Sequence, residues 1–283
     1  MEEQRYWQSM DMTVSKCVMT EGDFSNDCGK FGATLSFEIF EIDIERVDFD
    51  STILSDSILH QKTLMLRIGM ASNDVDLALE QAFCSMYPGE KSRFDVSSVK
   101  VSGSDENRLS LHFVVQRTDD NTKNLNVSKW PREEKMNFAQ ESYDKAVSHI
   151  KAKNYRGAFK LFKQAATLTM FSTDSQSATD LRIRSLSNLT LCQRHLEKYD
   201  LVVEGVDVIL DGNPNVSNAG KLIARRGQAE IKLQNYEKAI CDLNQALILD
   251  PDNKATQSDL KQAKAMLKNH DAKMSNAMKK MFG

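Results

Sequence analysis

The chain has 283 residues, of which 41% are hydrophobic and 27% are charged, and its net charge is −3. This composition is typical of a protein with a packed core, and the length is sufficient for two domains. A weakly acidic chain without a basic field argues against nucleic acid as the main partner.

The sequence contains no apolar run long enough to cross a bilayer, so we expect no membrane partner. Its N-terminal residues are polar and acidic and lack the layout of a secretory signal. We therefore predict a cytoplasmic location, with the nucleus as a further compartment. Reduced thiols that act as small buried apolar groups are expected at all five cysteines, Cys17, Cys28, Cys84, Cys192 and Cys241.

Residues 1–128 carry the period-two pattern of half-buried antiparallel strands. The alternation is strict at 64–68 and at 109–113, and it slips after Phe40 in the run 35–42. One short helix is predicted at about 75–86, and a polar linker is predicted around 119–131. The first half is therefore expected to be an antiparallel sheet with one helix.

Residues 129–283 change to a helical pattern that repeats three times. Each unit starts at a tyrosine, at 155, 199 or 236, and keeps apolar or small residues at offsets of 3, 7 and 10. These offsets place one apolar stripe on a helix. The third unit, residues 221–253, is similar to the tetratricopeptide-repeat (TPR) consensus along its whole length, so we predict three TPR units.

A last helix is predicted at about 252–281, with five apolar residues on one face: Leu260, Ala263, Leu267, Met274 and Met278. We expect this helix to be a packed cap of the repeat array, with methionine filling the core. Its methionine and lysine content leaves a calmodulin-type target as the alternative interpretation.

The order of a β domain, a linker, three TPR units and a long final helix resembles the FKBP-type immunophilins. The segments that carry this resemblance are GKFGATLSF (29–37), FDS (49–51), ALEQAFCSMYPGEKSRFDV (78–96), SLSNLTLC (185–192), KLIARRGQA (221–229) and the ending NAMKKMFG. The resemblance implies an α+β chain: an FKBP-like antiparallel sheet wrapped on a short helix in 1–128, then an all-α TPR superhelix in 129–283.

Isomerases of this family desolvate a twisted X-Pro amide in an aromatic pocket, which lowers a barrier of roughly 20 kcal/mol. The resemblance assigns Leu79 to the position of the tryptophan floor and Ile39 to that of a pocket tyrosine, and leaves Asp50 as the surviving polar residue. We therefore predict a vestigial pocket with no catalytic residue, no isomerase activity and no macrolide binding. The alternatives are a weakly active isomerase and, for Asp50, a cap of local backbone N–H groups.

Chaperone-binding TPR domains of the family hold a C-terminal carboxylate with five polar residues. The resemblance assigns three of them to Asn188, Lys221 and Arg225, and replaces the first-repeat lysine and asparagine by Tyr143 and Val147. Each lost charge-assisted bond costs about 1.5–3 kcal/mol, so we expect weakened binding of a heat-shock chaperone tail. A solvated basic helix face, or a groove for a hydrophobic or amphipathic peptide, is the alternative.

The leading hypothesis is a non-catalytic adaptor or co-chaperone that binds and regulates a client protein. The resemblance alone suggests a protein kinase of the casein kinase one family as client, in circadian regulation. A heat-shock chaperone cofactor with residual isomerase activity is the second hypothesis. A hydrolase or metalloenzyme is disfavoured because the five histidines have no metal-ligand spacing and no nucleotide motif is present, so we expect no metal and no cofactor.

Overall fold

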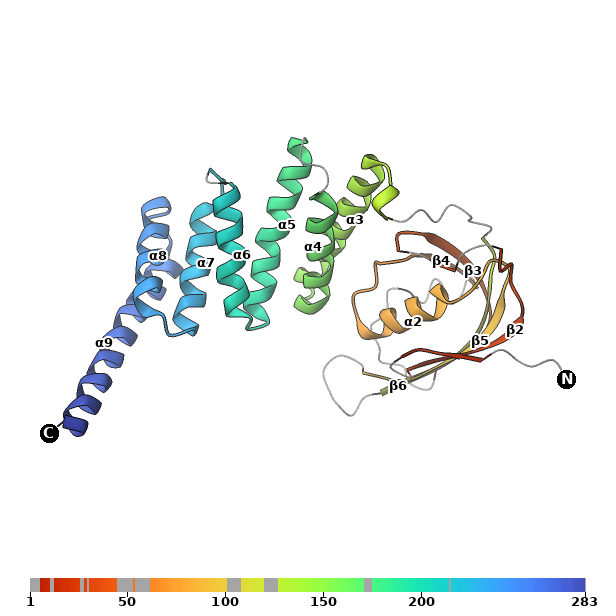
Figure 1. Cartoon of the computed structure of the whole chain (residues 1–283), viewed down its shortest axis with the longest axis horizontal. Helices are drawn as coiled ribbons and strands as arrows, with labels where there is room; N and C mark the ends of the chain where they lie inside the picture. Colours follow the sequence, from red (N-terminus) through yellow and green to blue (C-terminus); the bar gives the residue numbers. More distant parts are fainter. Residues whose placement is uncertain are drawn as a thin grey trace. The chain divides into compact units, whose positions relative to one another are not determined.

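The structure is a computed structural model of the whole chain (Figure 1). It describes residues 6–10, 13–25, 28–29, 31–44, 53, 62–100, 108–119, 127–170, 175–213 and 215–282. The chain divides into two compact units, residues 1–138 and 139–283. No helix in these described ranges is long and apolar enough to span a bilayer.

The first unit is a six-stranded antiparallel sheet that curves around helix α2 (Asp74–Cys84), as Figure 1 shows. The strand order across the sheet is β1-β2-β5-β6-β3-β4. The strands are β1 (Tyr6–Gln8), β2 (Val14–Thr20), β3 (Thr34–Ile44), β4 (Thr63–Arg67), β5 (Lys91–Lys100) and β6 (Arg108–Arg117). The predicted fold of this half is confirmed.

The core of the first unit lies between α2 and the inner face of the sheet. Phe83 of α2 is buried against Phe37 of β3, with ring centroids 4.6 Å apart, and Phe94 stacks on Phe113 at 5.2 Å. The predicted slip in β3 is a bulge, since its register against β6 shifts between Ile39 and Glu41. The inward set of side chains therefore changes phase at Phe40.

Strands β1, β2 and β5 were not predicted from the alternation of apolar residues. In β2 the inward positions include Lys16, whose side chain is buried, and in β5 they include Ser92. A polar side chain on the inner face breaks the apolar pattern on which a strand prediction depends. Strands β2 and β5 are half-buried all the same, because the polar groups find partners inside the unit, whereas the three residues of β1 are exposed.

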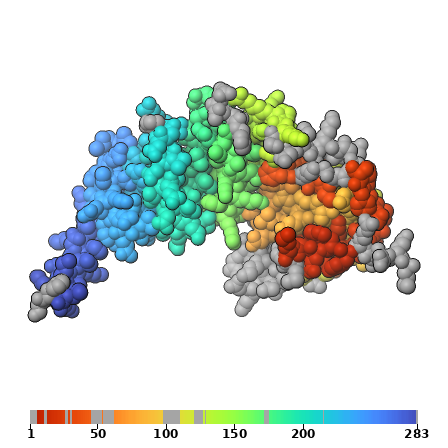
Figure 2. Space-filling model, viewed as in Figure 1, coloured from red at the N-terminus to blue at the C-terminus, as the bar shows by residue number. Residues whose placement is uncertain are grey.

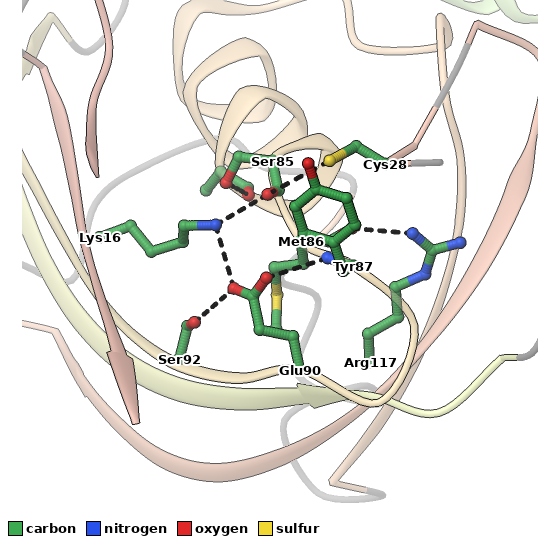
Figure 3. Close-up of polar contacts among 9 residues, drawn as sticks. Lys16, Cys28, Ser85, Met86, Tyr87, Glu90, Ser92 and Arg117 are labelled. Atoms are coloured by element: carbon green, nitrogen blue, oxygen red, sulfur yellow. Dashed lines mark hydrogen bonds and ion pairs between the residues drawn. The ribbon is translucent and has the colours of Figure 1, made fainter. Parts of the chain in front are cut away.

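Lys16 and Glu90 form a buried ion pair at the C-terminal end of α2 (Figure 3). The Lys16 Nζ donates to Glu90 Oε1 at 3.0 Å and to the carbonyl oxygen of Ser85 at 2.7 Å. The Ser92 hydroxyl and the Tyr87 backbone N–H donate to the same carboxylate, at 2.6 and 3.0 Å. A cation at the last carbonyls of a helix is stabilised by the helix dipole, so this network fixes α2 to β2 and β5.

A second buried cation reaches the same end of α2. Arg117 is fully buried, donates through Nη1 to the carbonyl oxygen of Met86 at 2.8 Å, and pairs with Asp119 at 2.9 Å. The turn between α2 and β5 is therefore held from both sides (Figure 3).

An aromatic cluster after the predicted linker packs within the first unit. Trp130 and Phe138 are buried, and both lie against Phe31, with ring centroids 6.2 and 5.3 Å away. Gly32 has φ +80°, and a Cβ there would meet the Trp130 ring at 1.8 Å, so glycine is required. The units therefore divide after Phe138, ten residues beyond the expected boundary at 128/129, because these rings pack on residues of the first unit.

The second half is built of antiparallel helices that follow one another in space (Figure 1). The tyrosine that begins each predicted repeat is the first residue of α4, α6 or α8, so the predicted repeat pattern is confirmed. A 3-10 turn, η1 (Val127–Lys129), precedes the array. The helices are α3 (Arg132–Lys151), α4 (Tyr155–Thr169), α5 (Gln176–His195), α6 (Tyr199–Gly212), α7 (Ala219–Lys232), α8 (Tyr236–Leu249) and α9 (Lys254–Phe282).

Small residues allow the helices of a repeat to approach closely. A Cβ at Gly227 of α7 would lie 2.9 Å from Leu243 Cγ of α8, which explains the glycine at this position.

Contacts also join α5 to α7 and α7 to α9, so alternate helices are neighbours along one face of the array. Residues on α5 and α7 can therefore act together.

The expectation that α9 is a packed cap is wrong for its second half. Ala263 is buried and Leu260 packs beside it, but Met274 and Met278 are 50% and 57% exposed. The reason is length, since α9 has 29 residues and its neighbour α8 has 14. Figure 2 shows the end of α9 projecting beyond the helices before it.

Candidate functional site

The two described residues of the vestigial pocket lie in the interior of the first unit. Ile39 of β3 and Leu79 of α2 are buried members of one apolar cluster. Neither side chain has a hydrogen-bond donor or an aromatic ring. Asp50, the third predicted pocket residue, lies outside the described residues.

Two buried carboxylates on α2 were missed by sequence analysis. Asp76 accepts from the backbone N–H of Ile53 at 3.3 Å, and Glu80 accepts from the backbone N–H groups of Gly69 and of Ala71, the latter at 3.2 Å. Both carboxylates are therefore occupied in holding the loops beside the helix. Their spacing of four residues on a helix was visible, but it carries no signal that distinguishes a loop anchor from a catalytic group.

The cysteines differ in exposure. Cys192 is buried as expected, whereas Cys241 is exposed, which corrects the prediction for that residue. Burial, with Glu80 nearby, raises the pKa of Cys84 to about 12, and burial raises that of Cys192 to about 12. Both thiols are therefore protonated and unreactive at neutral pH. Among the described residues, no group of three or more His, Cys, Asp or Glu is arranged to hold a metal ion.

In the second unit, α3 and α5 bring two predicted groove residues into contact. The Asn188 Nδ2 donates to the Tyr143 hydroxyl at 3.3 Å, and the Tyr143 ring meets Phe162 edge-on at 5.5 Å. Val147 lies one turn after Tyr143 on α3 and is half-buried. The Tyr143 hydroxyl thus accepts the hydrogen bond from the Asn188 side-chain amide that a ligand would otherwise accept.

The predicted pair on α7 divides into a structural cation and an exposed one. Arg225 donates through Nη1 to the Ser187 carbonyl oxygen at 2.5 Å and to the Thr190 hydroxyl at 2.7 Å, which ties α7 to α5. Burial, followed by the nearby Arg194, lowers the pKa of Arg225 to about 10. Lys221, one turn earlier, is exposed and makes no ion pair with any described residue.

Sequence analysis missed Arg184, the residue one turn before Asn188 on α5. Its guanidinium lies over the Tyr143 ring, 5.2 Å from the centroid, and the side chain is exposed. A cation over an aromatic face is held by the ring quadrupole. The i, i+4 spacing from Asn188 was the available signal.

A cavity of about 830 Å³ lies beside these residues, between the N-terminal half of α5 and the segment before α7. Arg184 lines it, together with Asp180 and Ile183 of α5 and Val216 and Asn218 from the other side. The cavity is mixed in character, with amide, charged and aliphatic groups. Such a lining suits a segment of polypeptide better than an apolar small molecule.

No protein-family model matches the chain. It is 32% identical over 150 residues to "FK506-binding protein-like" of Homo sapiens, covering 53% of this chain and 42% of that protein. It is 24% identical over 244 residues to "Peptidyl-prolyl cis-trans isomerase FKBP4" of Homo sapiens, covering 80% of this chain and 51% of the relative. The chain thus spans about half the length of the relatives it matches.

Among solved structures, the crystal structure of residues 1–211 of CG17282 aligns with a TM-score of 0.54 at 18% identity. The alignment covers 70% of this chain and 96% of that one. This likeness shows a shared fold. With the sequence matches, it supports the predicted architecture: the chain is similar to the FKBP-like immunophilins that carry a TPR domain.

Proposed function

We propose that the chain is a non-catalytic adaptor of the co-chaperone type, which binds a client protein through its second unit. The observation that carries this proposal is a contrast between buried, paired charges in the first unit and exposed cations in the second. The buried pairs Lys16–Glu90 and Arg117–Asp119 are satisfied within the first unit. In the second unit, Arg184 and Lys221 are exposed and make no ion pair with any described residue. Exposed cations, one of which lines a mixed cavity, are suited to recognising another protein.

The interior of the first unit supports the absence of isomerase activity. Ile39 and Leu79 are aliphatic and buried, so they supply neither the aromatic floor nor the hydroxyl donor that the family uses. Relatives such as FKBP4 carry the name of an isomerase, so the alternative is a weakly active isomerase that serves a heat-shock chaperone.

Binding of a chaperone tail is expected to be weak. Of the three retained residues, Asn188 is bonded to Tyr143 and Arg225 is bonded to α5, which leaves Lys221 exposed. A single exposed cation provides a small part of a five-residue clamp. In isothermal titration with an acidic chaperone-tail peptide, sub-micromolar binding that is lost in Lys221→Ala would contradict this view.

The identity of the client rests on resemblance. The sequence resembles the atypical FKBP-related protein named Bride of doubletime, and this likeness suggests a casein kinase one family kinase in circadian regulation. A cytoplasmic location, with entry to the nucleus, belongs to the same proposal. No described residue is specific for a kinase.

Affinity capture with the intact chain tests the adaptor function. We expect a set of proteins that the wild type retains and Lys221→Ala loses. Lys238→Ala is the matched control, because Lys238 is an exposed lysine on α8. The same set retained by all three proteins would contradict the proposal that the α5–α7 face binds the client.

A further inference from the structure

We propose that the cavity between α5 and the segment before α7 binds a carboxylate-bearing side chain of an extended acidic peptide, with Arg184 as its cation. This inference rests on the proposed adaptor function, since it names the chemistry of the client segment. In chaperone-binding relatives, the first helix pair contributes a cation that binds the anion. Here Tyr143 and Val147 take the clamp positions of that pair, so the proposal places the cation on α5 instead.

The position of Arg184 is the first support for this site. Its guanidinium is held over the Tyr143 ring at 5.2 Å, and the Tyr143 hydroxyl is in turn bonded to Asn188. Arg184 Nε donates to the Asp180 carbonyl oxygen at 3.4 Å, and no ion pair joins Arg184 to any described residue. A guanidinium fixed by an aromatic platform keeps its terminal N–H groups available for a carboxylate.

The amides of the cavity provide the second support. Asn213, Asn215 and Asn218 line the side opposite α5. Asn218 Nδ2 donates to the Ser187 hydroxyl at 3.4 Å, while its buried Oδ1 has no hydrogen-bond partner within the described ranges. A buried acceptor without a partner costs free energy, and a peptide N–H is the kind of donor that would satisfy it.

The charge of the lining disfavours a phosphate more strongly than a carboxylate. Asp180 and Arg184 are the charged residues that line the cavity, so its formal charge is zero. One arginine matches a monoanionic carboxylate, whereas a dianionic phosphate would leave a charge unpaired near Asp180. Ile183 and Val216, which pack against the apolar core below, would contact the aliphatic stem of a glutamate.

Fluorescence anisotropy with three probes tests the proposal. The probes are the heptapeptide SRMEEVD, the same peptide with an amidated C-terminus, and its Glu-to-Gln counterpart SRMQQVD. For the wild type we expect amidation to change the Kd by less than about twofold, and the glutamine peptide to bind about tenfold more weakly, as for one lost charge-assisted bond.

Arg184→Gln should abolish the difference between the glutamate and glutamine peptides, and Arg184→Lys should restore part of it. Tyr143→Leu, which removes the ring that positions Arg184, should reduce the difference, whereas Tyr143→Phe should retain most of it. Arg156→Gln is the control, because Arg156 is an exposed arginine on α4 away from the cavity. Melting temperatures of the variants verify that each one folds.

Equal binding of the three peptides to the wild type and to Arg184→Gln would overturn the proposal, as would no binding of SRMEEVD. Loss of affinity on amidation alone would show a terminal-carboxylate clamp instead. If Arg184 has no effect while Lys221→Ala still loses captured proteins, the adaptor function stands and this inference fails.

Discussion

The charged side chains around the end of α2 differ in their surroundings from Arg184 and Lys221 of the second unit. In the first unit Lys16, Glu90 and Arg117 are buried, and each bonds to partners around the end of α2. In the second unit Arg184 lines the cavity and Lys221 lies on α7, and both side chains are exposed. The same residue types therefore have different roles, and burial with its partners distinguishes a structural ion from one available to a ligand.

Breaking the ion pair of the first unit should have the largest effect. Lys16→Ala leaves the Glu90 carboxylate buried without its cation, which costs about 3–5 kcal/mol. Urea unfolding followed by tryptophan fluorescence measures this loss, because both tryptophans, Trp7 and Trp130, belong to the first unit. The double variant Lys16→Met, Glu90→Leu should recover much of the stability, and no recovery would contradict the account.

Removing a ring from the aromatic cluster should have the next largest effect. Phe138→Ala deletes a fully buried side chain that contacts Phe31 and Trp130, and we expect a loss of about 3 kcal/mol. The fluorescence transition should shift, because Phe138 belongs to the first unit. A shift confined to the helical signal in far-UV circular dichroism would place the boundary before Phe138 instead.

Much of this architecture was predictable from sequence, but the roles of individual polar residues were not. The tyrosine offsets located α4, α6 and α8, and strict alternation located β4 and β6, since periodicity reports directly on a buried face. Strand β2 was missed because its inward Lys16 looks like a surface residue until its partner, 74 positions away, is known. Arg225 was assigned to a ligand for the same reason.

Helix α7 carries both a structural cation, Arg225, and an exposed one, Lys221, so the two kinds can be compared within one helix. Arg225→Ala removes two hydrogen bonds to α5 and should destabilise the second unit by about 1–3 kcal/mol in far-UV circular dichroism. Lys221→Ala changes an exposed side chain, so its effect on unfolding should remain within about 0.5 kcal/mol. Equal destabilisation by both substitutions would remove the distinction between a structural and an available cation.

A smaller effect is expected from pH. His195 stacks on Tyr155 with ring centroids 3.9 Å apart, and desolvation, then Arg194 and Arg225, lowers its pKa. The unfolded chain therefore binds a proton near pH 6.5 that the folded chain resists, so stability should fall as pH drops below this value. His195→Phe keeps a ring in the stack and should flatten this part of the pH profile of the melting temperature. An unchanged profile would exclude His195 as its source.

The claim that the chain acts through its helical unit, and not through catalysis in its β unit, is tested most directly by a protease-coupled prolyl isomerisation assay. With Leu79 and Ile39 in the interior, we expect a rate equal to that of the uncatalysed peptide at any concentration of the chain. Turnover near that of active isomerases of the family would contradict the account.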